Sequence, residues 1–262
     1  NNLTLSTGDN ISGADITASG AISGVTTLTL ADVGGTATLS DDVDVTTLTV
    51  GSTVANVAFT GNGSSVTNAV SFANDGTLTI GPINGTVTFN GGLTTTSVGG
   101  TVTLGGGAVS LGGTSLVIAT SNDAVVLGAV TLGANTTINT NASDTTGDIT
   151  IGAVTGGSNT LTLTTENNIS NADITASGAI SGVTTLTLAS VGGTATLSGD
   201  VDVTTLAVDN TVANVAFTGN GSSVTNAFTP ANDGTFVFGT SGGTQTYNAG
   251  LTTTSVGSTV TL

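Results

Sequence analysis

A short strand recurs every 7 residues near the middle of this chain, at Val102-Thr103-Leu104, Val109-Ser110-Leu111 and Leu116-Val117-Ile118. Glycine pairs and triplets separate the strands, and glycine accepts the backbone conformations of tight corners. One strand and one corner therefore form one side, and three sides make a coil of about 20–24 residues. A longer spacing agrees, because Leu28 and Leu48 begin similar segments that lie about 20 residues apart.

A longer repeat covers most of the chain. Residues 1–104 return as residues 159–262 at an offset of 158 and without a gap. A gapless copy indicates that every residue belongs to a repeating track, as in a solenoid whose units contact their neighbours. We therefore expect one continuous β-solenoid over residues 1–262, with a first copy at 1–158 and a partial second copy after it. Dividing 158 residues into whole coils gives seven of about 22.6 residues, which we prefer, or eight of about 19.8.

Apolar and polar residues alternate within each short strand. Leu28-Thr29-Leu30 and Leu78-Thr79-Ile80 put aliphatic side chains on one face and threonine on the other, which defines a strand with one buried face. No stretch has a 3.6-residue period. The leading prediction is an all-β fold, a right-handed parallel β-helix, and a string of antiparallel β-sandwiches is the alternative. The narrow interior of a β-helix suits a chain with only 3% aromatic residues.

Composition excludes most chemistry. The chain has no Lys, Arg, His, Cys, Met or Trp, and its 16 acidic residues give a net charge of −16. Without cationic side chains there is no footprint for a phosphate backbone, so we expect no nucleic-acid partner. Without His or Cys the usual general bases, nucleophiles and zinc ligands are missing. No apolar run approaches the roughly 18 residues of a membrane span. We therefore expect no enzyme and no membrane span.

Several segments resemble a known family. Gly-Thr-Leu-Thr-Ile at residues 76–80, Gly-Thr-Val-Thr-Leu at 100–104 and Gly-Asp-Ile-Thr-Ile at 147–151 resemble the β-strand repeats of giant bacterial surface proteins, especially filamentous haemagglutinin-like exoproteins and adhesins. The resemblance covers essentially the whole chain. It implies an exported, fibrous cell-surface protein used in adhesion, sheath or matrix building. The Asn-Pro-Asn motif of two-partner secretion domains is missing, since Pro82 and Pro230 stand in other contexts.

Carboxylates are the groups left that could carry a site. Three lie together in the segment Ser-Asp-Asp-Val-Asp-Val at residues 40–45, and two of them return in the second copy. Our first interpretation is a solvated corner that keeps the protein soluble. The alternative is a Ca²⁺ site completed by carbonyl oxygens and water, whereas a glycosidase pair is disfavoured because Asp41 becomes Gly199. The candidate Ca²⁺ ligands are Asp41, Asp42, Asp44, Asp200 and Asp202.

Three asparagines are kept between the copies. In a solenoid, an asparagine at a corner can bond to neighbouring coils and form a ladder. A ligand-binding loop is the alternative, but the turn at residues 61–65 offers no charged or aromatic anchor. The expected ladder positions are Asn56, Asn62, Asn68, Asn214, Asn220 and Asn226.

Threonine pairs form a second candidate surface. Thr36/Thr38, Thr77/Thr79 and Thr101/Thr103 are separated by one residue, as in flat ice-binding β-helices. The simpler interpretation is that threonine is favoured on an exposed strand face.

These observations favour a structural function. We expect the repeat region of an extracellular fibre, sheath or adhesin stalk, acting as a stiff acidic rod. Its partners would be more of the same polypeptide or identical subunits stacked end to end, with surface glycans as a further possibility. The alternative is a surface-binding protein that recognises carbohydrate, a Ca²⁺-bridged matrix or ice. The two copies diverge most between residues 70–91 and 228–249, where apolar residues replace apolar residues, which indicates repacking and not a new site.

Overall fold

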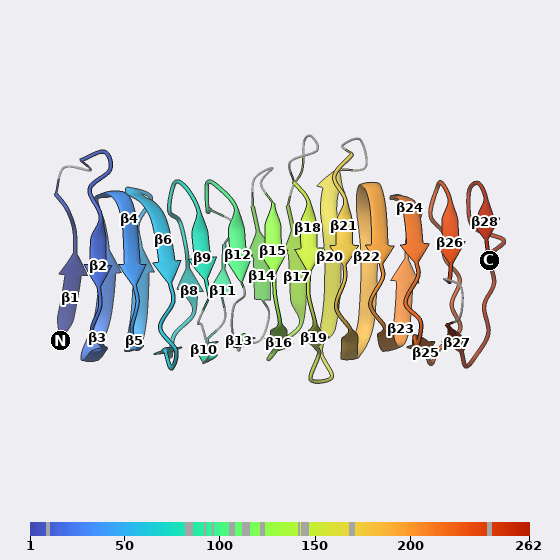
Figure 1. Cartoon of the computed structure of the whole chain (residues 1–262), viewed down its shortest axis with the longest axis horizontal. Helices are drawn as coiled ribbons and strands as arrows, with labels where there is room; N and C mark the ends of the chain where they lie inside the picture. Colours follow the sequence, from blue (N-terminus) through green and yellow to red (C-terminus); the bar gives the residue numbers. More distant parts are fainter. Residues whose placement is uncertain are drawn as a thin grey trace. The chain divides into compact units, whose positions relative to one another are not determined.

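The structure is a computed structural model that describes residues 1–8, 11–81, 86–91, 93–95, 97–104, 108–111, 116–120, 124–140, 142, 147–167, 171–239 and 243–262. Every regular element in these residues is a β-strand, and parallel strands stack as a β-solenoid of about 11 turns (Figure 1). The predicted all-β parallel fold is therefore confirmed. The chain divides into two compact units, Asn1–Ser121 with Val126–Ala134 and Asn122–Val125 with Asn135–Leu262.

The strands of the first unit are short and closely spaced. They are β1 (Asn2–Leu5), β2 (Ile16–Ala18), β3 (Ile22–Leu30), β4 (Val33–Leu39), β5 (Val43–Val50), β6 (Val54–Phe59), β7 (Ser65–Val66), β8 (Val70–Ser71), β9 (Leu78–Ile80), β10 (Thr86–Phe89), β11 (Leu93–Thr94), β12 (Val102–Leu104), β13 (Ala108–Leu111), β14 (Leu116–Ala119) and β16 (Val130–Leu132). The strand β15 (Val125–Leu127) falls where the assignment changes from one unit to the other. The predicted strand spacing is confirmed in β12, β13 and β14, although glycines 105–107 and residues 112–115 between them lie outside the described residues.

The strands of the second unit repeat this pattern. They are β17 (Thr136–Asn139), β18 (Ile149–Ile151), β19 (Val154–Thr155), β20 (Thr160–Asn167), β21 (Ile174–Ala176), β22 (Ile180–Leu197), β23 (Val201–Val208), β24 (Val212–Phe217), β25 (Ser223–Val224), β26 (Phe236–Phe238), β27 (Thr246–Tyr247) and β28 (Val260–Thr261).

Parallel pairing between successive coils sets the length of each coil. In the first unit Leu28 pairs with Leu48, and Leu78 pairs with Val102. These two separations lie at the lower and the upper end of the predicted coil length. The second unit has the same register at the matching position, since Leu186 pairs with Leu206. The coils that these three pairings join therefore have the length that the sequence predicts.

Some coils are longer than predicted. Val154 pairs with Ile180, which exceeds the predicted upper limit. The turn at residues 156–159 adds one residue, because residues 155–160 lie opposite the shorter stretch 181–185, and the rest of the excess lies between Thr164 and Ile174. Gly157 and Ser158 in this turn have positive φ angles of 56° and 70°, which is the conformation of a tight reversal. Extra residues are thus accommodated at a corner while the strands keep their register.

The pairings within each unit bear on how many coils one repeat length holds. Successive pairings carry Ile22 to Val130 in five coils of the first unit, and Val154 to Ile180 is one coil of the second. The sequence from Val130 to Val154 is as long as the coil that joins Leu78 to Val102. The preference for seven coils agrees with these lengths and stays a prediction where the chain passes from one unit to the other.

Aliphatic and aromatic side chains stack inside each unit in columns. In the first unit Leu39 lies against Phe59, and Phe59 against Ile80, and none of the three is exposed to solvent. In the second unit Leu197 lies against Phe217, which pairs with Phe238. The hydrophobic core is therefore one narrow column of side chains per side, stabilised by burial of apolar area between neighbouring coils.

Candidate functional site

Two asparagines join successive coils at the same place in each copy. The Asn56 side-chain oxygen accepts hydrogen bonds from the Thr77 backbone N–H at 2.8 Å and from its hydroxyl at 2.9 Å. The Asn214 oxygen accepts the same two bonds from Thr235, both at 3.0 Å. Each asparagine thus bonds to the following coil, and its partner is a threonine.

A second pair of asparagines bonds to the preceding coil. The Asn68 amide donates to the Thr47 hydroxyl at 2.9 Å, and Asn226 makes the same bond to Thr205. The remaining candidates, Asn62 and Asn220, lie on exposed turns, where the Asn220 carbonyl accepts the Thr244 N–H at 2.7 Å. Corner side chains therefore tie each coil to its neighbours.

The clustered carboxylates have different environments. The Asp42 carboxylate accepts the Gly63 N–H of the next coil at 2.6 Å, and Asp200 accepts the Gly221 N–H at 2.7 Å. The exposed Asp41 accepts the Asp42 N–H at 2.9 Å. These three carboxylates are used to hold corners.

The described part of the chain contains no group of three or more acidic, His or Cys side chains placed to hold a metal ion. Ca²⁺ at the five candidate aspartates therefore stays a prediction.

Asp44 and Asp202 differ from the other members of the cluster. Each is exposed on the outward face of a strand, and its carboxylate has no hydrogen-bond partner among the described residues. Each also borders an open groove. The Asp44 groove has a volume of about 440 Å³ and is lined by Gly24, Val25, Thr26, Asp44, Val45, Thr46, Ser65 and Thr67.

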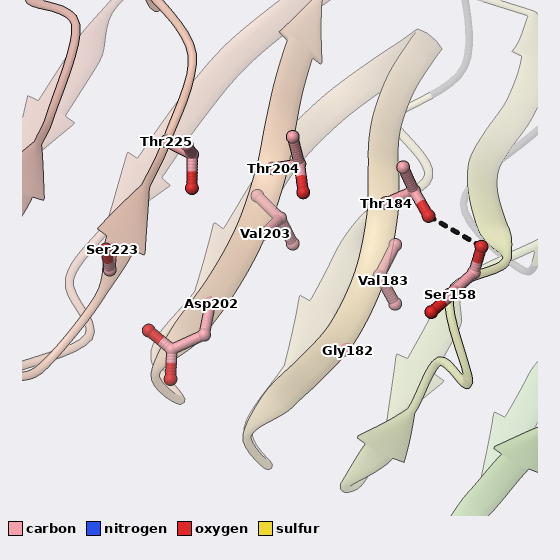
Figure 2. Close-up of a pocket in the computed structure, with 9 residues that line it drawn as sticks. All are labelled: Ser158, Gly182, Val183, Thr184, Asp202, Val203, Thr204, Ser223 and Thr225. Atoms are coloured by element: carbon pink, nitrogen blue, oxygen red, sulfur yellow. Dashed lines mark hydrogen bonds between the residues drawn. The ribbon is translucent and has the colours of Figure 1, made fainter.

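The Asp202 groove occupies the matching position in the second unit. Its volume is about 410 Å³, and it is lined by Ser158, Gly182, Val183, Thr184, Asp202, Val203, Thr204, Ser223 and Thr225 (Figure 2). All of these residues except Ser158 are the counterparts, one repeat length further on, of the residues that line the Asp44 groove. The same hollow is therefore built twice from the same residue types.

Strand register arranges the lining of the groove. Val183 pairs with Val203, and Val203 with Val224, so the threonines that follow these valines lie in a row across three coils. Figure 2 shows Thr184, Thr204 and Thr225 in this row, with Val203 between Thr204 and Asp202. The groove thus has a hydroxyl row on one side and a carboxylate on the other, whereas the side chains of Val183 and Val203 are buried in the core.

A glycine lies at a β-bulge in the lining of each groove. The register between β22 and β23 shifts between Ser181 and Val183, and the intervening Gly182 has a φ of 66°. The matching Gly24 has a φ of 68°, and a Cβ added there would meet no atom within 4 Å, whereas a Cβ at Gly182 would lie 3.6 Å and 3.7 Å from backbone nitrogens of residues 157 and 156. A glycine inside a strand pattern is a recognised signal of a bulge. The segment Ser-Gly-Val-Thr-Thr carries this signal, but nothing in the sequence itself links the segment to Asp44.

Hydrogen bonds fix some edges of the grooves and leave others free. The Thr184 hydroxyl donates to the Ser158 carbonyl at 2.6 Å, and the Ser223 hydroxyl oxygen accepts the Asn248 amide at 3.4 Å. In the part of the chain that the structure describes, the exposed side chains of Thr204 and Thr225 make no such bond. Each groove therefore offers uncommitted oxygen atoms.

The Thr-x-Thr pairs form only interrupted arrays. Thr79 pairs with Thr103, but Ala58 lies between Thr38 and Thr79 in the same column. The Thr77 hydroxyl is already bonded to an asparagine.

Aromatic residues occupy the region where the copies diverge. The rings of Phe236 and Phe238 stack with centroids 4.2 Å apart, and Tyr247 packs against Phe228 at 5.8 Å. The Tyr247 hydroxyl donates to the Gln245 side chain at 2.8 Å, and burial raises the pKa of this phenol. A cavity of about 210 Å³ lies beside Phe238, Gln245 and Tyr247.

Comparison with known proteins gives no relative. No family model matches the chain, and neither the curated proteins nor the solved structures contain a match. Within the described residues, no helix is long and apolar enough to cross a membrane.

Proposed function

We propose that this chain is the structural repeat region of an extracellular fibre, sheath or adhesin stalk and has no catalytic role. The observation that carries the proposal is the identical cross-linking of coils in both copies. Asn56 and Asn214 make the same bonds to the next coil, as do Asp42 and Asp200. A sequence that repeats its corner bonds from one copy to the next is suited to building length.

The charge supports an exposed setting. A net charge of −16 without any cationic side chain keeps a protein soluble and discourages nonspecific association with anionic surfaces. The family resemblance in the strand repeats points the same way. We therefore place the chain at the cell surface, where its partners would be further turns of the same polypeptide or identical subunits.

Location is tested on the cells that make the protein. An antibody raised against this segment should label fibres or a surface layer of intact cells in electron microscopy. Label found only after the cells are opened would contradict the proposal.

The absence of catalysis is tested separately. The protein should release no reducing ends from polysaccharides, and the Asp44→Asn, Asp202→Asn double variant should behave in the same way. Turnover that disappears in this double variant would replace the structural proposal with an enzymatic one.

A surface-binding function is the second candidate. The two matching grooves favour it, because a purely structural coil has no need of a hollow lined by free polar groups. A stalk that also binds a ligand combines the two functions.

A further inference from the structure

We propose that the Asp44 groove and the Asp202 groove each bind a primary ammonium group, such as a lysine side chain of a basic polypeptide or a free alkyl diamine carries. The inference is independent of where the protein resides, because it rests on the lining of the grooves.

Charge identifies the sign of the ligand. The chain contains no Lys, Arg or His, so none of its side chains can neutralise Asp202. Anionic ligands are repelled by the net charge of −16, and cationic ones are attracted. The carboxylate in each groove is therefore a site for a cation supplied from outside the chain.

Hydrogen-bonding capacity favours an ammonium group over a metal ion. An ammonium has three donors and no acceptor. Asp202 offers only acceptors, and the free hydroxyls of Thr204 and Thr225 add further acceptor oxygens. A Ca²⁺ ion takes 6–8 oxygen ligands, commonly several carboxylates, whereas each groove has one carboxylate.

The lining of the groove suits a compact cation. Val183 and Val203 are buried in the core, so they line the groove chiefly with backbone atoms, and Gly182 adds no side chain. A guanidinium prefers a flat, bidentate contact with one carboxylate, whereas an ammonium can donate to acceptors spread over several strands.

Two grooves of matching lining predict two sites per chain, although the Thr26 hydroxyl accepts from the Asn1 amine whereas Thr184 donates to the Ser158 carbonyl. Ion pairs exposed to solvent are weak, so we expect each site to have a dissociation constant above about 1 mM. Added salt should weaken binding further, since screening acts over about 10 Å at 0.1 M ionic strength.

The experiment is a titration of the isotope-labelled protein with N-acetyl-lysine-amide, followed by NMR. Backbone amides at Thr46 and Thr204 should both shift as the ligand is added. The same ligand acetylated on its side-chain amine should cause no shift. Titration with 1,4-diaminobutane then distinguishes the sources: equal binding means that free amines also occupy the grooves, and weaker binding means that the lysine backbone contributes.

Matched variants locate the site. Asp202→Asn should weaken binding at Thr204 about fivefold and leave Thr46 unchanged, and Asp44→Asn should do the reverse. Asp75 and Asp233 are an equally exposed, duplicated pair outside both grooves, so Asp75→Asn with Asp233→Asn is the control. Circular dichroism of every variant checks that the fold is retained.

Three results would overturn the proposal. One is the absence of shifts at both grooves. Another is an equal loss of affinity in the control variant, which would show diffuse attraction to the whole surface. The third is an equal response to the neutral sugar cellohexaose that survives Asp202→Asn, which would identify a carbohydrate groove.

Discussion

The corner asparagines differ in how many bonds their side chains make to other coils. Asn56 accepts two hydrogen bonds from Thr77, whereas the exposed Asn68 donates one to Thr47. An intramolecular hydrogen bond contributes about 0.5–1.5 kcal/mol net. We expect Asn56→Ala to lower the free energy of unfolding by about 1–2 kcal/mol and Asn68→Ala by less than about 0.5 kcal/mol. Urea unfolding followed by circular dichroism measures both.

Asn214→Ala provides an internal replicate of this measurement. It breaks the same two bonds in the second unit, so it should resemble Asn56→Ala. Equal costs for Asn56→Ala and Asn68→Ala would contradict the argument, because water would then be satisfying the Thr77 groups as well as the asparagine does.

Tyr247 gives the fold a sensitivity to alkaline pH. Burial raises the pKa of its phenol above the usual value of about 10. The unfolded chain therefore loses the proton first as pH rises, and stability that is fully present below pH 10 declines above it. The urea concentration at the midpoint of unfolding should therefore be lower at about pH 11 than at about pH 9.

The composition of the chain leaves one side chain to explain an alkaline decline in stability. Tyr247 is the only tyrosine, and the chain has no Lys or Cys, so no other side chain titrates in that range. Tyr247→Phe should remove the alkaline decline. A decline of equal size in the phenylalanine variant would show that some other process unfolds the protein.

For individual residues, the sequence predicts which side chains lie at corners better than it predicts their hydrogen-bond partners. The repeated asparagines were expected at corners, but their threonine partners depend on register, which brings Thr77 to Asn56 from 21 positions away. Likewise, alternation places Asp42 and Asp44 on one side of a strand. Only the position of Gly63 in the next coil commits Asp42 to the corner and leaves Asp44 free. Coil length, set by a few corner residues, decides both outcomes.

Individual strands have core residues fitted to their own copy. Phe236 replaces Leu78, and each side chain is fully buried in its own unit. Phe236→Leu would remove the stacked contact with Phe238 and leave a void, at a cost of about 1–2 kcal/mol. Leu78→Phe should also destabilise, by about 1–3 kcal/mol, because Leu78 is already fully buried and the larger ring would overpack the core.

Thermal and urea unfolding of the two variants measure these costs, with the exposed Thr77→Ser as a mild comparison. If Phe236→Leu leaves the free energy of unfolding unchanged, the neighbouring rings close the void. The aromatic residues of the second copy would then be interchangeable with the aliphatic residues of the first.

The strands were predicted in position but not in length. The sequence predicts short strands, and β9 and β12 agree. The strand β22 instead runs over 18 residues, because hydrogen bonding continues through Gly182 and through Ser190, which has a φ of 50°. A strand that bends at a bulge while keeping its partners has no simple signal in a period-two pattern. The same bend creates the groove, which explains why the groove escaped sequence analysis.

For the whole molecule, the dominant property is charge of one sign. Sixteen carboxylates and no cationic side chain make molecules repel each other in low salt. The −16 charge is screened by all salts, but a divalent cation can also bridge carboxylates of two molecules, including the free ones at Asp44 and Asp202.

We therefore expect Ca²⁺ to increase light scattering of the purified protein more than NaCl at the same ionic strength, and EDTA to reverse the increase. Bridging requires carboxylates that are not already bonded within the fold. Asp44→Asn with Asp202→Asn should reduce the effect more than Asp42→Asn with Asp200→Asn, because the latter pair already accepts backbone N–H groups. Circular dichroism must first show that both double variants keep the native fold. Scattering that is indifferent to Ca²⁺ and EDTA would exclude cation bridging, and an equal response to NaCl would reduce the effect to screening.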